Sequence, residues 1–237
     1  MSSTPRSRPV IAIDGPAASG KSTTARAVAE ELGYAHLDSG ALYRAVTLVA
    51  LEAGGGPRSW RGDALAAIAR DRRVALRRGE SGGGAYEATI GGAPAGDALR
   101  AAAVTANVSA VAAMPEVRAF VNELLRGAAK DGGVVLDGRD IGTAVFPDAE
   151  VKVFLVADPA ERARRRLAER GGATDEVSIR AEARDLTRRD QRDSSREAAP
   201  LARAADAELL DTTGLSFEQQ VAAIVELARR RGARPGA

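Results

Sequence analysis

The chain has 237 residues, a net charge of +2 and no cysteine, which excludes a disulfide framework and a cysteine-based metal site. Its length is sufficient for a substantial core, which we expect to form one domain with an insertion. No apolar stretch approaches the ~20 residues of a membrane span, and residues 1–9 lack the apolar segment of a signal peptide. We therefore expect a cytoplasmic protein without a membrane partner.

Arginine dominates the basic residues, because Lys21, Lys130 and Lys152 are the only lysines among 34 lysines and arginines. The arginine guanidinium binds phosphate and carboxylate groups in a planar fork, which suits nucleotide ligands. A GC-rich genome also favours arginine and alanine codons, so position must identify the functional arginines. The basic ends, 1–9 and 232–237, are expected to be loose tails rather than nucleic-acid-binding segments.

The first predicted elements enclose a phosphate-binding motif. Residues 10–13 are apolar and predict a buried strand, and residues 21–32 predict a helix that ends at Gly33. Between them, residues 15–22 match G-x-x-x-x-G-K-[ST], whose backbone N–H groups surround a polyphosphate at a helix N-terminus. Lys21, expected to be exposed on the loop, would contact the β and γ oxygens, and the Ser22 hydroxyl could bind Mg²⁺. The sequence therefore predicts a nucleoside triphosphate site.

The next segment combines helices with a predicted antiparallel hairpin. Residues 35–37 form a short apolar run, and Asp38-Ser39 predicts the cap of a helix over about 40–53. A glycine-rich linker and a short helix precede 73–77 and 86–90, where polar and apolar residues alternate on either side of the glycines at 82–84. We expect residues 60–100 to form a small antiparallel insertion, followed by helices over 104–113 and 116–128.

The remainder alternates strands with helices. Residues 134–136, 151–156 and 208–210 predict strands, and capping sequences at Asp158 and Ser216 predict helix starts. Apolar strands that alternate with helices are typical of a parallel sheet covered on both faces. The predicted fold class is therefore α/β, with a central parallel sheet flanked by helices.

Three segments outside the phosphate motif combine arginine with carboxylates, at 38–44, 137–140 and 189–196. The first two follow apolar runs, so they should lie at the carboxyl ends of strands, where open α/β sheets bind ligands. A phosphate-bearing acceptor requires such cations, because two anions must approach each other before transfer.

Five pieces of the sequence together closely resemble bacterial cytidylate kinases. They are IAIDGPAASGKST, LDSGALYRA, VSAVAAMPEVR, LDGRDIGTAVFPDA and RRDQRDSSREAAPL, in the same order from about residue 10 to 230. The resemblance implies a P-loop kinase core over 10–59 and 101–231, a lid over about 158–190, and a nucleoside-monophosphate-binding insertion over 60–100. It further implies transfer of the γ-phosphoryl group of MgATP to CMP or dCMP by a monomer.

The resemblance also implies roles for individual residues. The ATP phosphates and Mg²⁺ would be held by Gly15, Pro16, Ala17, Ala18, Ser19, Gly20, Lys21, Ser22 and Thr23, with Ser22 as metal ligand. CMP would be bound by Ser39, Tyr43, Arg44, Ser109, Arg118, Arg139, Asp140, Arg189, Asp193 and Arg196. Catalytic contacts would come from Lys21, Arg139, Arg196 and two lid arginines, Arg162 and Arg165. Within the CMP set, Arg44, Arg139 and Arg196 match phosphate contacts, Ser109, Arg118 and Asp140 the base, and Arg189 and Asp193 the ribose.

Other roles remain open from spacing alone. Arg162 and Arg165 could belong to a solvated helix face, and Tyr43 could simply pack. Asp137 either caps the following turn or supports Mg²⁺ binding, and His36, the sole histidine, is interpreted as structural. Two rival functions are another small-molecule kinase, for uridylate or shikimate, and a nucleotide-dependent switch that binds a protein partner.

Overall fold

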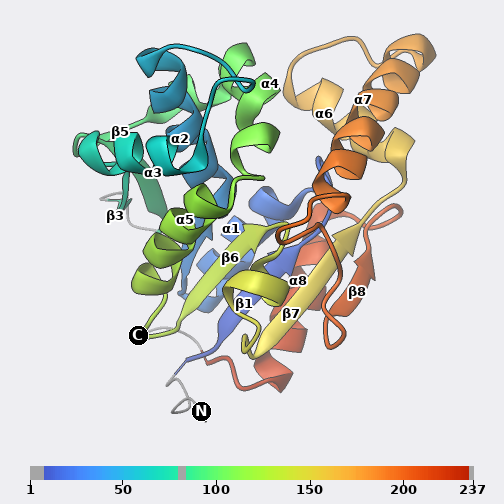
Figure 1. Cartoon of the computed structure of the whole chain (residues 1–237). Helices are drawn as coiled ribbons and strands as arrows, with labels where there is room; N and C mark the ends of the chain where they lie inside the picture. The colour runs from blue at the N-terminus through green and yellow to red at the C-terminus, as the bar shows by residue number, and fades with distance from the viewer. Residues whose placement is uncertain (1–7, 80–83, 235–237) are drawn as a thin grey trace.

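A parallel sheet of five strands forms the centre of the protein in a computed structural model that describes residues 8–79 and 84–234 (Figure 1). The strand order is β2-β6-β1-β7-β8, and every neighbouring pair is parallel. The strands are β1 (Val10–Asp14), β2 (Ala35–Asp38), β6 (Val134–Gly138), β7 (Val151–Val156) and β8 (Glu208–Asp211). The predicted α/β fold with a central parallel sheet is confirmed.

Helices cover both faces of this sheet because its strands are apolar on both sides. Val10 and Ala12 of β1 pack against helices α2 to α5, whereas Ile11 and Ile13 pack against α1 and α8. The helices are α1 (Lys21–Leu32), α2 (Ser39–Ala53), α3 (Gly62–Asp71), α4 (Ala102–Val111), α5 (Pro115–Ala128), α6 (Pro159–Glu169), α7 (Glu176–Ser194) and α8 (Phe217–Arg230). The result is a three-layer architecture.

Local capping fixes three helix starts where the sequence predicted them. The Asp38 carboxylate accepts a hydrogen bond from Ala41 N at 3.2 Å, and Asp158 accepts one from Ala160 N at 2.8 Å. Ser216 and Gln219 form a reciprocal capping box. These contacts join residues only two or three positions apart, so the short sequence motif is enough to specify them.

A second, antiparallel sheet consists of β3 (Ala75–Arg78), β4 (Tyr86–Ile90) and β5 (Ala93–Pro94), within the predicted insertion over 60–100. The predicted hairpin is confirmed, although most of its glycine turn, at 80–83, lies outside the described residues. The two-residue strand β5 was not predicted, because it is too short to show alternation. Of the predicted tails, 1–7 and 235–237 also lie outside the described residues.

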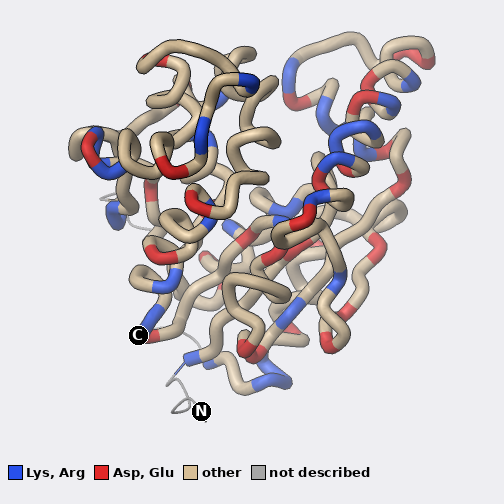
Figure 2. The backbone as a smooth tube through the Cα atoms, in the orientation of Figure 1, with Lys and Arg blue, Asp and Glu red and all other residues tan. Residues whose placement is uncertain are grey.

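The 19-residue helix α7 was not predicted as an element. It is mostly charged and, of its described residues, buries only Ile179, Leu186 and Asp193, so it lacks a broad apolar stripe. Figure 2 shows basic and acidic residues alternating along α6 and α7, which pack against each other. In Figure 1 this pair lies on one side of the carboxyl ends of the sheet, and α2, α3 and α4 lie on the other. None of the helices in the described ranges is long and apolar enough to cross a membrane.

Candidate active site

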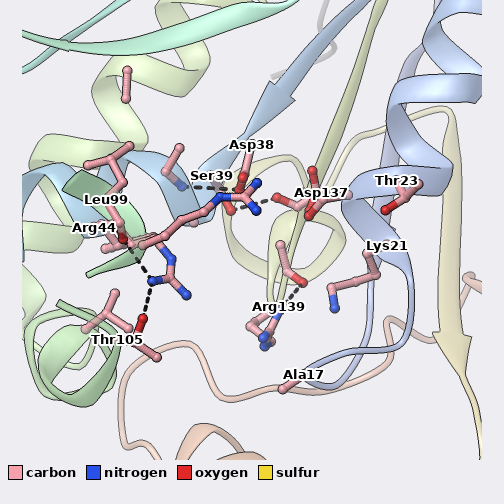
Figure 3. Close-up of a pocket in the computed structure, with 18 of the residues that line it drawn as sticks. Ala17, Lys21, Thr23, Asp38, Ser39, Arg44, Leu99, Thr105, Asp137 and Arg139 are labelled. Carbon is pink, nitrogen blue, oxygen red and sulfur yellow. Dashed lines mark hydrogen bonds between the residues drawn. The ribbon is translucent and has the colours of Figure 1, made fainter. Parts of the chain in front are cut away.

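A cavity of about 1300 Å³ lies at the carboxyl ends of β1, β2 and β6. It is lined by the phosphate motif, by the start of α2, by α4 and by residues of α6 and α7. Ligand pockets usually have about 300 to 1000 Å³, so this one has room for two small ligands side by side. Figure 3 shows residues from several of these elements around the same space.

Backbone geometry shapes the phosphate motif. Gly15 has a φ of +150°, and a Cβ there would overlap the carbonyl oxygen of Leu155 in β7. Gly20 has a φ of +84° and precedes the first residue of α1, so both positions require glycine. Ala18 adopts a left-handed φ of +57°, which is uncommon for a residue with a side chain.

Lys21 is buried rather than exposed, which corrects the sequence expectation. Its side chain folds back under the loop, where Nζ donates to Pro16 O at 2.5 Å and to Ser19 Oγ at 3.3 Å. The reason is its position as the first residue of α1, beneath the loop that it closes. Burial and the neighbouring Arg139 lower the pKa of the Lys21 ammonium well below its usual value. Figure 3 shows Lys21 and Arg139 facing the same part of the cavity.

Ser22, Asp137 and His36 form a hydrogen-bonded chain beside the loop. Ser22 Oγ donates to Asp137 Oδ2 at 2.5 Å, and His36 Nε2 lies 2.8 Å from Asp137 Oδ1. Burial opposes the charge of Asp137, but the hydrogen bonds with His36 and Ser22 and the nearby Lys21 together lower the pKa of Asp137. Burial first, and then the charge of Asp137, raise the pKa of Asp38 to about 6. Asp137 is therefore an ionised carboxylate.

This oxygen-rich corner fits a magnesium ion. A serine hydroxyl and an ionised carboxylate are hard oxygen donors, and Mg²⁺ usually binds one or two such groups together with substrate phosphates and water. The described residues contain no group of three or more acidic or histidine side chains that could form an all-protein metal site. An ion held by Ser22 and Asp137 would therefore need further oxygen ligands from a bound substrate or from water.

Arg118 and Asp140 line the same cavity and form a buried ion pair. Arg118 also donates from Nη1 to Ala112 O at 3.1 Å, and its guanidinium lies 5.6 Å from the centre of the Tyr43 ring. Burial raises the pKa of Asp140, although Arg118 opposes the shift. Tyr43 is 7% exposed and both packs in the core and lines the cavity.

Asp193 of α7 brings together three predicted acceptor-site residues. Its Oδ1 accepts from Ser109 Oγ at 3.3 Å and from Arg196 at 2.5 Å, and its Oδ2 accepts from Arg139 Nε at 3.2 Å. Arg189 lines the same cavity, where burial and the charge of Arg139 lower its pKa to about 10. Two guanidinium groups thus bind one carboxylate and a third lines the same cavity, which leaves excess positive charge there.

Two further predicted residues line the cavity from α2. Arg44 donates to Leu99 O at 3.1 Å and to Thr105 Oγ1 at 3.0 Å, as drawn in Figure 3. Ser39 Oγ donates to the backbone oxygen of Asp137 at 2.7 Å. The start of α2 is thereby fixed to α4 on one side and to β6 on the other.

Helix α6 presents a different arginine from those predicted. Arg166 of α6 and Arg170, which follows the helix, line the cavity, whereas Arg162 and Arg165 do not. Arg165 donates to Thr212 O at 2.7 Å, and Arg162 contacts Ala17. Arg166 lies 2.9 Å from Glu182. Arg166 lies four residues after Arg162, on the same face of the helix, but this spacing does not by itself show which arginine reaches the cavity.

Asp14, at the end of β1, is another residue that sequence reasoning missed. Its two carboxylate oxygens accept hydrogen bonds from Ile141 N at 2.8 Å and Gly142 N at 2.7 Å. Burial raises the pKa of Asp14 to about 6. It therefore fixes the turn that carries Arg139 and Asp140 to the strand that precedes the phosphate motif.

The sequence pattern described as cytidylate kinase matches residues 11–230. The chain belongs to the cytidylate kinase family. It is 44% identical to the cytidylate kinase of Geobacter sulfurreducens over the full length of both chains. It is 46% identical to the cytidylate kinase of Limosilactobacillus fermentum, over 89% of this chain and 91% of that one. The predicted family resemblance is confirmed.

A further relative is longer than this chain. The bifunctional pantoate ligase/cytidylate kinase of a Synechococcus strain is 47% identical over 93% of this chain, but the match spans only 43% of that protein. Among solved structures, an uncharacterized protein from Eubacterium ventriosum covers 94% of this chain with a TM-score of 0.50 and 12% identity. That likeness concerns the fold alone.

Proposed function

We propose that this cytidylate kinase family member transfers the γ-phosphoryl group of ATP to CMP or dCMP, giving ADP and CDP or dCDP. The observation that carries the proposal is that one cavity joins the phosphate motif to the Arg118–Asp140 pair and to the arginines around Asp193. A donor and an acceptor could therefore meet in line within one cavity.

The donor side would be formed by the loop Gly15 to Thr23, whose N–H groups face the ATP phosphates. Lys21 would contact the oxygens that gain charge during transfer. Ser22 would ligate Mg²⁺ and Asp137 would support it, since both present oxygen donors. When bound, the ion balances negative charge on the transferring phosphates.

The acceptor would be bound by other residues that line the cavity. Arg44, Arg139 and Arg196 would hold the CMP phosphate, and Arg189 with Asp193 would hold the ribose. Ser109, Arg118 and Asp140 would read the base, with Ser39 and Tyr43 completing the wall. The acceptor phosphate is already an anion near neutral pH, so no general base is required, and His36 would serve through Asp137 instead.

We further propose that residues 158–190 act as a lid over a core of 10–59 and 101–231, with 60–100 as the acceptor-binding insertion. Arg166 would contact the triphosphate, because it lines the cavity. Arg165 would act from the same helix by fixing it to Thr212, and Arg162 by contacting the loop.

A monomer working in the cytoplasm without nucleic acid is part of the same proposal. The lack of cysteine suits a reducing compartment.

The test is a coupled assay of ADP formation with CMP, dCMP, UMP and AMP, run on the wild type and on Asp140→Asn. Cytosine offers an amine donor to Asp140 and an acceptor to Arg118, whereas uracil reverses both. We expect a preference for CMP over UMP on the order of 10⁴ in kcat/KM, because opposed buried polar groups are costly. Asn can donate to the uracil oxygen, so the variant should lose much of that preference.

Asp131→Asn, at an exposed carboxylate, is the matched control and should keep the wild-type preference. Equal use of all four acceptors by the wild type would exclude the proposed substrate. ADP formation that no monophosphate stimulates would favour the rival nucleotide-dependent switch.

A further inference from the structure

The apex of the phosphate loop is bound by two helices that lie far from it in the sequence. Ala17 N donates to Asp190 Oδ1 in α7 at 2.8 Å, and Ala17 O accepts from Arg162 Nη1 in α6 at 2.9 Å. The same Arg162 Nη1 lies 2.5 Å from Asp190 Oδ2. Both polar backbone groups of Ala17 are thus held by one ion pair.

This ion pair is shielded from solvent. The side chains of Arg162 and Asp190 are 6% and 15% exposed, and Arg162 Nε also donates to Ala157 O at 3.2 Å. Charge-assisted hydrogen bonds of this kind are stronger than neutral ones, and low solvent access strengthens them further. The contact is therefore better suited to holding a fixed geometry than the exposed ion pairs elsewhere on α7.

Apolar packing reinforces the same junction. Ala17 is 1% exposed and belongs to a small buried cluster with Ala163 of α6 and with Ile179 and Leu186 of α7. The next residue, Ala18, has the left-handed φ noted above, which persists only where surrounding contacts determine it. The loop conformation thus depends on the two helices as well as on its own glycines.

We infer that Asp190 and Arg162 are positioning residues that hold the phosphate loop in its ATP-binding shape through Ala17. The inference rests on the proposed function, in which this loop binds ATP and α6 and α7 belong to the lid. Neither residue lines the cavity, so both act through the loop rather than by touching a substrate. Loss of this ion pair would therefore release the loop at Ala17, whereas the contacts of Asp193 with the acceptor-site residues would remain.

The test compares ATP affinity with CMP use in four variants. The affinity for a fluorescent ATP analogue is measured by titration without CMP, and the KM for CMP is measured at saturating ATP. Asp190→Ala and Arg162→Met should each weaken ATP binding by about tenfold or more, with the KM for CMP within about twofold of wild type. Asp190→Asn should have an ATP affinity between those of the wild type and Asp190→Ala, because its amide oxygen can still accept a hydrogen bond from Ala17 N. The double variant Asp190→Ala/Arg162→Met should bind the ATP analogue about as tightly as the single variant with the lower affinity, because the two residues form one unit.

Asp185→Ala is the matched control, since this exposed carboxylate on the same helix pairs only locally with Arg188. This control should leave both the affinity for the ATP analogue and the KM for CMP unchanged. Unchanged ATP affinity in folded Asp190→Ala, equal losses for ATP and CMP, or additive losses in the double variant would overturn the inference. If Asp190→Ala does not fold, Asp190→Asn and Arg162→Met decide the question by the same comparison. Because the ATP titration needs no acceptor, it remains decisive even if CMP is not the substrate.

Discussion

Lys21 combines burial with a charge that the site needs. Its ammonium is held by the backbone oxygen of Pro16 and the hydroxyl of Ser19, and its surroundings include the carboxylates of Asp137, Asp190 and Asp14. A buried ammonium costs free energy unless nearby anions and hydrogen-bond acceptors compensate. The loop therefore supplies acceptors in advance, which keeps the cation close to the place where ATP phosphates would lie.

Lys21→Met should abolish transfer while preserving the fold, because methionine keeps most of the apolar stem and removes only the ammonium. We expect kcat/KM to fall by well over tenfold, which corresponds to more than about 1.4 kcal/mol of transition-state stabilisation. Steady-state kinetics with CMP measure the loss, and circular dichroism melting confirms the fold. Retention of more than about a tenth of the activity would contradict a direct role.

At the scale of elements, the close approach of the phosphate loop to β7 sets the shape of the donor site. Gly15 lies against the backbone of Leu155, so the loop can sit over the strand only if position 15 has no side chain. The same glycine has a φ of +150°, which L-residues rarely adopt. The loop thus packs against β7 because residue 15 has no Cβ atom.

Gly15→Ala should lower the free energy of unfolding by more than about 2 kcal/mol, because the loop must move away from β7. Gly91→Ala is a suitable control: its φ is +62°, and a Cβ there would meet nothing within 4 Å. The control therefore shows only the cost of the left-handed conformation, about 1 kcal/mol. Urea unfolding of both variants gives the two values, and equal losses would show that the contact with Leu155 has no effect.

At the scale of the whole molecule, Asp14 joins the two halves of the site. Its carboxylate connects the end of β1, which leads into the donor loop, with the turn at Ile141 and Gly142, which follows the acceptor residues. Each of these hydrogen bonds joins two residues that are more than 120 positions apart in the sequence. This buried acid therefore helps to fix the position of the phosphate loop relative to the turn that follows Arg139 and Asp140.

Burial makes this link dependent on pH. The pKa of Asp14 is raised from 3.8 to about 6, so its contribution to stability is fully present below pH 3.8 and is lost as the pH rises through about 6. This change in the pKa of Asp14 corresponds to about 3 kcal/mol. Asp14→Asn has no carboxyl to titrate, so the difference in unfolding free energy between wild type and variant should fall by about that amount from pH 4 to 7. Asp38 titrates in both proteins and cancels in the difference.

Urea unfolding at pH 4, 5, 6 and 7 measures this difference. A value that stays constant over the range would mean that Asp14 titrates alike in the folded and unfolded chains.

The sequence by itself determined the elements whose signals are local. Apolar runs identified every strand of the central sheet, and the capping residues Asp38, Asp158 and Ser216 marked three helix starts. The phosphate motif identified the donor loop because its glycines and Lys21 act within a few residues of one another. Family motifs, more than spacing, selected the acceptor residues that line the cavity.

Only the tertiary structure decided features that depend on packing between distant segments. The charged helix α7 has a defined inner face only because α6 lies against it, so its pattern did not reveal it. For the same reason the sequence could not distinguish Arg165 from Arg166, since the direction of each side chain depends on how α6 sits on its neighbours. The burial of Lys21, the pairing of Arg118 with Asp140 and the contact of Asp190 with Ala17 likewise follow from long-range packing, to which local sequence patterns are insensitive.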